Sequence, residues 1–473
     1  MSAVCIFLPA LSGLVLFVMN RSGAKVLRAF TLLSLCVTGL FCAASLFVGS
    51  SVRFSLFFSG LVFSLRADGL SVLFSLLGVF LFFLCTVFAF EYMKKEEREN
   101  QFFAFLLLSF SGFLGMTLSE NLFTAYVFFE MITLCSFPLV LHERTKAALY
   151  GGMKYLFYSI GGSLLALFGV FLLCFNGSCT FSPDVSAENS PLMTVGVFCC
   201  VVGFGAKAGM FPMQSWLPSA HPVAPAPASA LLSGAITKAG IFMVCRVLFF
   251  CGGKDVLAGT WAQTVLLWLA LITVLLGSVL ALREKELKKR LAFSTVSQTS
   301  YILLGFLTLT PEGAAGGILH VLLHGFAKTA LFLAAGAVIC RTGVRQVDFF
   351  DGMGRKMPLV MTAFTLASLA LVGVPPTIGF SSKWALASGA LSGNLGFFGI
   401  AVPVVLLISA IFTAGYLLDV SAKSFLASSG EDDSRLKTSF FLSLPPLLLS
   451  VGTLVFGLFS GALFDFAVRI LGF

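Results

Sequence analysis

Long apolar segments separated by short polar loops run along the whole chain, and this pattern predicts a membrane protein built from helices. A segment of about 20 apolar residues is long enough to cross the hydrocarbon of a bilayer as a helix. The predicted spans cover residues 3–20, 29–48, 69–90, 101–117, 120–141, 155–175, 192–211, 227–250, 261–282, 291–309, 314–340, 358–382, 396–418 and 441–465. The sequence therefore predicts an all-α polytopic membrane protein with about 14 transmembrane helices.

Composition agrees with this pattern. Of the 473 residues, 58% are hydrophobic and 11% are charged, whereas a soluble globular protein has about 25% charged residues. The first apolar run has no basic leader and precedes an ordinary loop, so we expect it to be a span and not a cleaved signal peptide.

The formal net charge of +9 is explained by the distribution of the basic residues. They concentrate in alternate loops, at Arg21, Lys25, Arg28, Lys94, Lys95, Arg98, Arg144, Lys146, Arg283, Lys285, Lys288, Lys289, Arg290, Arg341, Arg345, Arg355, Lys356, Lys423, Arg435 and Lys437. The other loops and ends hold Arg53, Arg66, Lys254 and Arg469. By the positive-inside rule, we expect a plasma (inner) membrane protein with both termini outside and no nucleic-acid partner. Lys154 and Arg246 lie near span ends, where they are expected to snorkel.

The 12 cysteines lie mostly inside spans and are interpreted as small apolar core residues. Cys174, Cys179 and Cys251 lie near the predicted outer face, so a disulfide there stays open. No iron–sulfur or haem motif is present. We therefore expect no cofactor and no catalytic centre in this chain, and any electrons are expected to be carried by another subunit.

Two predicted spans are interrupted by proline. Phe211-Pro212 and a proline-rich segment follow the span 192–211, and Gly373-Val-Pro-Pro lies inside the span 358–382. In hydrocarbon, the carbonyls freed by proline must be satisfied by protein or water. These spans are the seventh and the twelfth, and the odd offset reverses their direction. Interrupted helices in corresponding positions of two inverted halves point to a transport site; two kinks that only shape packing are the alternative.

Two ionisable residues lie deep in separate spans. Glu130 is near the centre of the span 120–141, and Lys207 is in the span 192–211. Such a group at bilayer depth costs at least about 2.5 kcal/mol. A nearby carboxylate favours a protonated lysine and desolvation opposes it, so separating the two would switch the lysine between holding and releasing a proton. A static structural ion pair is the alternative.

Further deep bases outnumber the deep acid. Lys238 is at the middle of the span 227–250, while His320, His324 and Lys328 share one helix face at spacings of four. Histidine titrates near neutrality and can relay protons, so we predict a hydrated polar axis through the bundle. The alternatives are lysines that line an anion pore, and a packed histidine face without a transport role. No nearby acid completes a metal site, so none is expected.

Lys383 follows the second interruption and is predicted to exchange protons with the outer side, or else to snorkel. Hydroxyl and amide groups on the span 291–309 are expected to hold connecting waters or to bond neighbouring helices.

Several of these stretches, in this order, resemble one family. The stretch that begins Lys207-Ala-Gly-Met-Phe-Pro-Met-Gln-Ser-Trp-Leu-Pro-Ser-Ala-His-Pro looks like the signature of the antiporter-like membrane subunits. The segments around Glu130, from His320 to Lys328, from Leu287 to Gln298 and from Gly373 to Lys383 are similar to it too. Such subunits occur in respiratory complex I, in membrane-bound hydrogenases and in Mrp-type sodium/proton antiporters.

The resemblance implies fourteen helices in a single membrane domain with two inverted five-helix repeats and interrupted helices 7 and 12. The implied division is N-terminal helices in 1–100, a first repeat in 101–250, a second in 261–418 and a C-terminal helix in 441–473. It also implies a proton path, with Glu130 and Lys207 as a paired switch, Lys238 as the central relay, His320, His324 and Lys328 as the second relay, and Lys383 as the terminal residue.

The expected function is therefore proton translocation by one subunit of a redox-driven pump, together with other membrane subunits and the lipid bilayer. A subunit of an Mrp-type cation/proton antiporter, which would also move Na⁺, and a non-conducting structural subunit are the alternatives. Gln214 stands where many members have histidine, which removes a titratable group from the entry side and allows the structural alternative.

Overall fold

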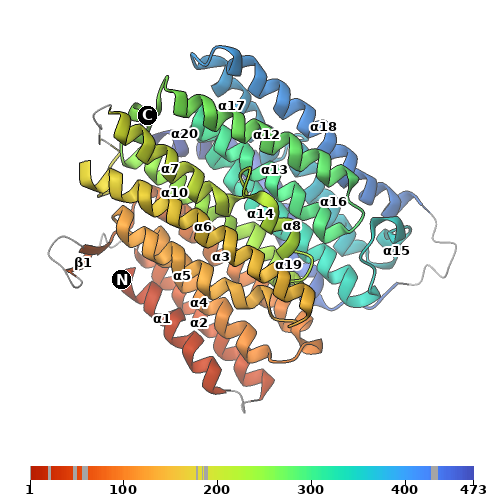
Figure 1. Cartoon of the computed structure of the whole chain (residues 1–473). Helices are drawn as coiled ribbons and strands as arrows, with labels where there is room; N and C mark the ends of the chain where they lie inside the picture. Colours follow the sequence, from red (N-terminus) through yellow and green to blue (C-terminus); the bar gives the residue numbers. More distant parts are fainter. Residues whose placement is uncertain are drawn as a thin grey trace.

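The computed structural model describes residues 2–19, 23–45, 51–55, 62–176, 179–183, 185, 190–427 and 435–473. Its longer helices are α1 (Ser2–Val18), α2 (Ala24–Ser45), α3 (Gly69–Tyr92), α4 (Glu99–Thr117), α5 (Leu122–Val140), α6 (Lys146–Asn176), α7 (Pro191–Ala208), α10 (Thr237–Phe250), α12 (Trp261–Arg283), α13 (Leu287–Leu307), α14 (Pro311–Thr342), α16 (Pro358–Val372), α17 (Ile378–Ser392), α18 (Phe397–Leu426) and α19 (Phe440–Leu458). Shorter elements are η2 (Met93–Lys95), η3 (Gln214–Trp216), α8 (Leu217–Ala220), α9 (Ala226–Leu231), η4 (Leu232–Ile236), α11 (Gly253–Leu257), η5 (Val347–Phe349), α15 (Met353–Lys356) and α20 (Ser460–Ile470). The helices form one bundle, with α1 and α2 at one side and α17 and α18 at the other (Figure 1).

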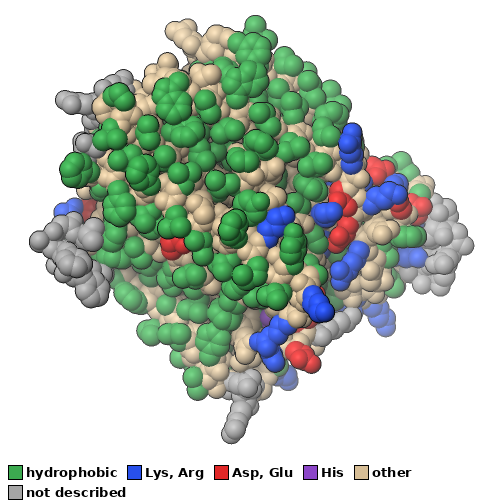
Figure 2. Space-filling model, viewed as in Figure 1, with side chains coloured by type: hydrophobic (Ala, Val, Ile, Leu, Met, Phe, Trp, Pro, Cys, Tyr) green, Lys and Arg blue, Asp and Glu red, His purple; other side chains and the backbone are tan. Residues whose placement is uncertain are grey.

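Among the described residues, 11 helices are long and apolar enough to cross a membrane, and Ser2–Val18 and Pro358–Val372 are shorter apolar helices. Apolar side chains cover the broad face of the molecule in Figure 2, while Lys, Arg, Asp and Glu gather along one edge. These features fit a polytopic helical membrane protein. The number of fourteen spans and the division into repeats stay predictions.

Helices α7 and α16 both end at a glycine with a left-handed backbone, Gly209 (φ 86°) and Gly373 (φ 96°). In both, the next residue's N–H bonds to a carbonyl five residues back: Met210 to Gly205, and Val374 to Leu369. This is the hydrogen bond of a Schellman cap, in which glycine is favoured at positive φ. The two interruptions therefore lie where the proline pattern predicted them, and each leaves carbonyls at a helix end inside the bundle.

The loops form two sets. The first side is called here the basic face (loops 93–98, 141–145, 284–286 and 343–357). There Glu286 forms a β-bridge with Gln346, and Arg341 at the end of α14 forms an ion pair with Glu91 at the end of α3. The opposite face carries a two-stranded hairpin, β1 (Val52–Ser55) and β2 (Val62–Leu65), which the all-helical prediction did not include. The hairpin and both chain termini lie at the same end in Figure 1.

The cysteines near the opposite face adopt one of the pairings that the sequence left open. Cys174 and Cys179 form a disulfide, whereas Cys251 is free and buried. The disulfide joins the end of α6 to the segment whose backbone meets the start of α5, since the N–H of Leu122 donates to the carbonyl of Cys179 at 2.9 Å.

Candidate functional site

Lys207 lies in the last turn of α7 and points at the middle of α5. Its ammonium donates to the carbonyl of Phe129 at 3.1 Å and to the hydroxyl of Thr133, and it lies 4.1 Å from the centre of the Phe129 ring. Glu130 lies between these two acceptors in the sequence, yet its Oε1 atom is buried without a hydrogen-bond partner. The structure thus brings Lys207 to the Glu130 segment without a direct ion pair between the two side chains.

Lys238 follows a short π-helical segment, η4, in the fully buried centre of the bundle. Its ammonium donates to the carbonyl of Ser233 at 2.6 Å and is hydrogen-bonded directly to Nδ1 of His324 on α14. π-Helical turns often mark functional sites. Here the turn supplies an acceptor five residues before the lysine, a geometry that sequence periodicity did not reveal.

His320 lies one helical turn before His324 on α14 and connects three helices. Its Nδ1 is 3.0 Å from the hydroxyl of Ser382 on α17, and its Nε2 is 3.1 Å from Oε1 of Gln298 on α13. The imidazole also stacks on Tyr301, with ring centres 5.2 Å apart. With an amide oxygen at one ring nitrogen and a hydroxyl at the other, both nitrogens have partners suited to a neutral imidazole.

Lys383 is held by the second interruption. Its ammonium donates to the carbonyls of Leu371 and Val372, at 2.7 and 2.9 Å, which are the last residues of α16. The Lys383 Nζ atom also lies 5.3 Å from the centre of the Tyr301 ring, and the same ring stacks on His320. The side chain is partly exposed in the isolated chain. Carbonyls freed by the helix break thus become acceptors for a lysine, as expected where a helix ends inside a membrane.

Hydroxyl groups connect the end of α7 with the centre of the bundle. Thr299 donates to the carbonyl of Ala208 at 2.7 Å, beside Lys207, and also to the carbonyl of Thr295 at 2.8 Å. The Thr295 hydroxyl is in turn 2.8 Å from that of Ser233, whose carbonyl accepts from Lys238. The polar residues expected on the span 291–309 therefore bond protein groups directly between Lys207 and Lys238.

Lys328 lies one turn beyond His324 and donates to the carbonyl of Leu291 at 3.2 Å. Near it is His221, which was not predicted as a site residue. The His221 ring is fully buried, stacks on Phe332 at 4.7 Å, and has both nitrogens without a hydrogen-bond partner. The only signal in the sequence was its place in the proline-rich segment after α7.

Two basic residues are more deeply placed than expected. Lys288, taken as a loop cation, is buried and donates to the carbonyl of Pro222 at 3.2 Å. Arg246, expected to snorkel, is fully buried and bonds to the carboxylate of Asp68 at 2.6 and 2.8 Å. In both cases acceptors inside the protein replace water, so neither side chain has to reach the membrane surface.

These bases, all buried except the partly exposed Lys383, thus have hydroxyls, amides, backbone carbonyls and one another as partners. The term "polar axis" is used below for Lys207, Lys238, His320, His324, Lys328 and Lys383. Among the described residues, no group of three or more His, Cys, Asp or Glu side chains is close enough to hold a metal ion. Lysine and histidine in hydrogen-bond contact can exchange a proton without forming or breaking any other bond.

Residues 119–411 match the family model described as "NADH:quinone oxidoreductase/Mrp antiporter, TM", and residues 58–103 match "NADH-Ubiquinone oxidoreductase (complex I), chain 5 N-terminus". The first match includes all six residues of the polar axis. The chain belongs to this family of antiporter-like membrane subunits.

Relatives in the family have different names. NADH-quinone oxidoreductase subunit N of Desulforudis audaxviator is 33% identical over 85% of this chain and 82% of its own length. Na(+)/H(+) antiporter subunit A1 of Staphylococcus saprophyticus is 32% identical over 87% of this chain and 55% of its length. Hydrogenase-4 component B of Escherichia coli is 34% identical over 68% and 50%. This chain therefore spans about half the length of the last two relatives.

Solved structures share the fold along the entire chain. The Mrp complex from Dietzia sp. DQ12-45-1b contains a chain with a TM-score of 0.87 at 24% identity, matched over 99% of this chain and 97% of that one. Respiratory complex I from Thermus thermophilus contains one with a TM-score of 0.84 at 25% identity, matched over 100% and 98%.

Proposed function

We propose that this chain translocates protons as one membrane subunit of a multi-subunit redox-driven pump of the NADH–quinone oxidoreductase or hydrogenase type. The observation that carries the proposal is the direct hydrogen bond between Lys238 and His324 in the buried centre of the bundle. A buried pair of bases is an expensive way to stabilise a membrane protein, whereas a proton relay requires titratable groups at this depth.

In the proposed path, a proton passes between Glu130 with Lys207 and the central pair Lys238–His324, then to His320 and Lys383, with Lys328 beside the central pair. Support comes from the hydroxyls between Lys207 and Lys238 and from the Tyr301 ring between His320 and Lys383. The bonds of Lys207 to Phe129 and Thr133 fit a state in which the lysine has moved away from Glu130.

The proposed architecture is fourteen transmembrane helices with two inverted five-helix repeats. It is supported by the identical glycine caps at the ends of α7 and α16 and by a lysine near each break, Lys207 and Lys383. We propose a location in the plasma membrane with both termini on the outer side, because the basic loops share one face. Other membrane subunits are the proposed partners, since the similar solved chains belong to an Mrp complex and to respiratory complex I.

Cation/proton antiport in an Mrp-type assembly is the second candidate. It is favoured by the similarity to sodium/proton antiporter subunit A1 and by the structural match to the Mrp complex. In that case Na⁺ would move against protons, and the same polar axis would carry the proton.

The deciding experiment measures proton flux by the assembled complex in proteoliposomes. Lys238→Ala should lower flux roughly ten-fold or more, because proton relays of this kind contribute at least that factor. Lys25→Ala, which removes an exposed lysine at the start of α2, is the matched control and should leave flux unchanged. Normal flux in assembled Lys238→Ala complex would support the structural subunit instead. Flux that depends on a sodium gradient without an electron donor would support antiport.

A further inference from the structure

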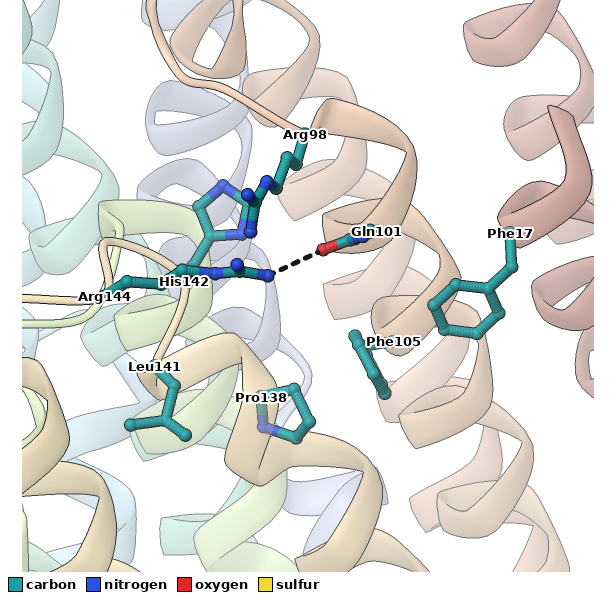
Figure 3. A pocket seen from close by; sticks show the side chains of 8 residues that line it. All are labelled: Phe17, Arg98, Gln101, Phe105, Pro138, Leu141, His142 and Arg144. Atoms are coloured by element: carbon teal, nitrogen blue, oxygen red, sulfur yellow. Dashed lines mark hydrogen bonds between the residues drawn. The ribbon is translucent and has the colours of Figure 1, made fainter. Parts of the chain in front are cut away.

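A cavity of about 430 Å³ opens at the basic face where α1, α4 and the end of α5 meet. Its size is that of a small-molecule site. The loop after α5 and the start of α4 supply its polar groups, and the helices supply its apolar groups (Figure 3). None of these residues belongs to the polar axis, so proton transfer does not explain them.

Two arginines define the polar half of the cavity. Arg98 and Arg144 both have left-handed backbones, with φ of 60° and 54°, a conformation that non-glycine residues adopt infrequently and often at functional sites. Arg144 donates to Oε1 of Gln101 at 3.2 Å, as Figure 3 shows. Neither guanidinium forms an ion pair among the described residues, and Glu99, next to Arg98, is paired with Arg28 at 2.7 Å.

His142 lies between the two arginines and has an unused polar atom. Its Nε2 is buried without a hydrogen-bond partner, while its ring packs edge-on against Phe102 at 5.4 Å. Burial and the charge of Arg98 lower the pKa of His142, although a backbone hydrogen bond at Glu97 opposes them. The polar half therefore holds two arginines without an ion pair and an imidazole nitrogen without a partner, and no Asp or Glu is among its lining residues.

The other half of the cavity is apolar. Phe17 of α1 and Phe105 of α4 pack edge to face, with ring centres 5.1 Å apart. The outer surface of α1 continues this apolar region, since Leu11 and Leu14 are 60% and 54% exposed. A ligand in this cavity would therefore have its anionic end at the loops and its apolar end along the helices.

We propose that this cavity binds an anionic glycerophospholipid, with its phosphate between Arg98 and Arg144 and its acyl chains against Phe17 and Phe105. Basic pockets between transmembrane helices on the cytoplasmic side are known to bind such headgroups. The apolar half distinguishes a lipid from free phosphate, because a small anion has nothing to place there. The proposal is independent of whether the polar axis moves protons.

The test is native mass spectrometry of the intact complex, purified in detergent and supplied with phosphatidylglycerol. The double variant Arg98→Asn/Arg144→Asn removes both charges, and asparagine tolerates the left-handed backbone. It should retain about ten-fold less phosphatidylglycerol, the effect expected for lost charge-assisted bonds to phosphate. The matched control Arg283→Gln/Arg345→Gln removes two exposed arginines of the same face outside the cavity and should retain the wild-type amount.

Further arms separate the lipid from other occupants. Phosphatidylcholine at the same concentration should be retained less than phosphatidylglycerol, and inorganic phosphate should not displace the lipid. Phe105→Trp, which fills the apolar half, should lower retention even if the asparagine variant fails to assemble. Equal retention by wild type and both cavity variants, equal retention of the two lipids, or displacement by phosphate would each overturn the proposal.

Discussion

The side chains of Lys238 and His324 are hydrogen-bonded through Nζ and Nδ1, and both are fully buried. Only one proton can lie on that bond. When the lysine is charged the histidine nitrogen accepts, and when the proton has moved to the histidine its N–H donates to the neutral amine. Because the remaining acceptor of Lys238 is the carbonyl of Ser233, no carboxylate in contact with Lys238 fixes the proton on one side, and transfer between the two requires only a shift along the bond.

His324→Asn tests this relationship. Asparagine keeps a hydrogen-bond acceptor near the position of Nδ1 but cannot take up a proton at neutral pH. We expect normal assembly and a loss of proton flux of roughly ten-fold or more, measured in proteoliposomes of the intact complex with Lys25→Ala as control. Wild-type flux in His324→Asn would show that His324 has only a packing role.

Thr133 offers a test of the resting position of Lys207. The Thr133 hydroxyl and the Phe129 carbonyl accept hydrogen bonds from the ammonium of Lys207. Thr133→Val removes one acceptor and keeps the shape of the side chain, so the charged lysine is less well accommodated there. We expect about a three-fold to ten-fold loss of flux, smaller than the loss in Lys207→Ala. Thr133→Ser restores the hydroxyl and should restore flux; if it does not, the hydroxyl is not the relevant feature.

Lys383→Arg separates a titrating group from a fixed charge. A guanidinium can donate to the carbonyls of Leu371 and Val372 as the ammonium does, but it does not release its proton in proteins. We therefore expect normal assembly with roughly ten-fold or more loss of flux, and a similar loss in Lys383→Gln. Wild-type flux in Lys383→Arg, at matched levels of assembled complex, would mean that Lys383 acts only as a fixed charge.

The helix interruptions and the deep lysines could be predicted, because the position of a residue within an apolar segment indicates its depth in the membrane. The predicted interruptions at Pro212 and at Pro375-Pro376 lie within a few residues of the observed ends of α7 and α16. Deep charge is rare enough that Lys207 and Lys238 could be singled out individually. Whether each member of the polar axis carries protons is not tested by the geometry and stays a prediction.

What could not be predicted depends on partners that are distant in the sequence. From the sequence, Lys288 is a loop cation. In the structure the proline-rich segment lies against it, and the carbonyl of Pro222 accepts its hydrogen bond. From the sequence, Arg246 is expected to snorkel. In the structure Asp68, at the start of α3, lies beside it and forms an ion pair. The π-helical turn η4 could not be predicted from hydrophobic periodicity, because all five residues of Leu232–Ile236 are buried and no polar face marks the turn.

Arg246 and Asp68 provide a stability test. Breaking a buried ion pair by removing one partner destabilises by about 3–5 kcal/mol, whereas removing both can be far less harmful. Arg246→Met should therefore lower the melting temperature of the purified protein markedly. Arg246→Met combined with Asp68→Asn should recover part of the loss, because asparagine still caps α3 through the Ser71 N–H. A double variant that is as unstable as the sum of the single changes would show that the pair is not coupled.

Glu120 gives a pH-dependent prediction on the face opposite the basic face. Hydrogen bonds from Arg53, together with the charges of Arg53 and Arg66, lower the pKa of the Glu120 carboxyl despite its burial. Because the pKa is lower in the folded state, its stabilising contribution is present above the ordinary value of about 4.3 and is lost as pH falls through the folded pKa. Glu120→Gln should therefore lower the melting temperature by roughly 1–2 °C at neutral pH, and the difference from wild type should shrink below about pH 4. Arg53 is 63% exposed, so high salt should weaken the effect. An equal difference in melting temperature at both pH values would show that Glu120 stabilises the hairpin through packing and not through its charge.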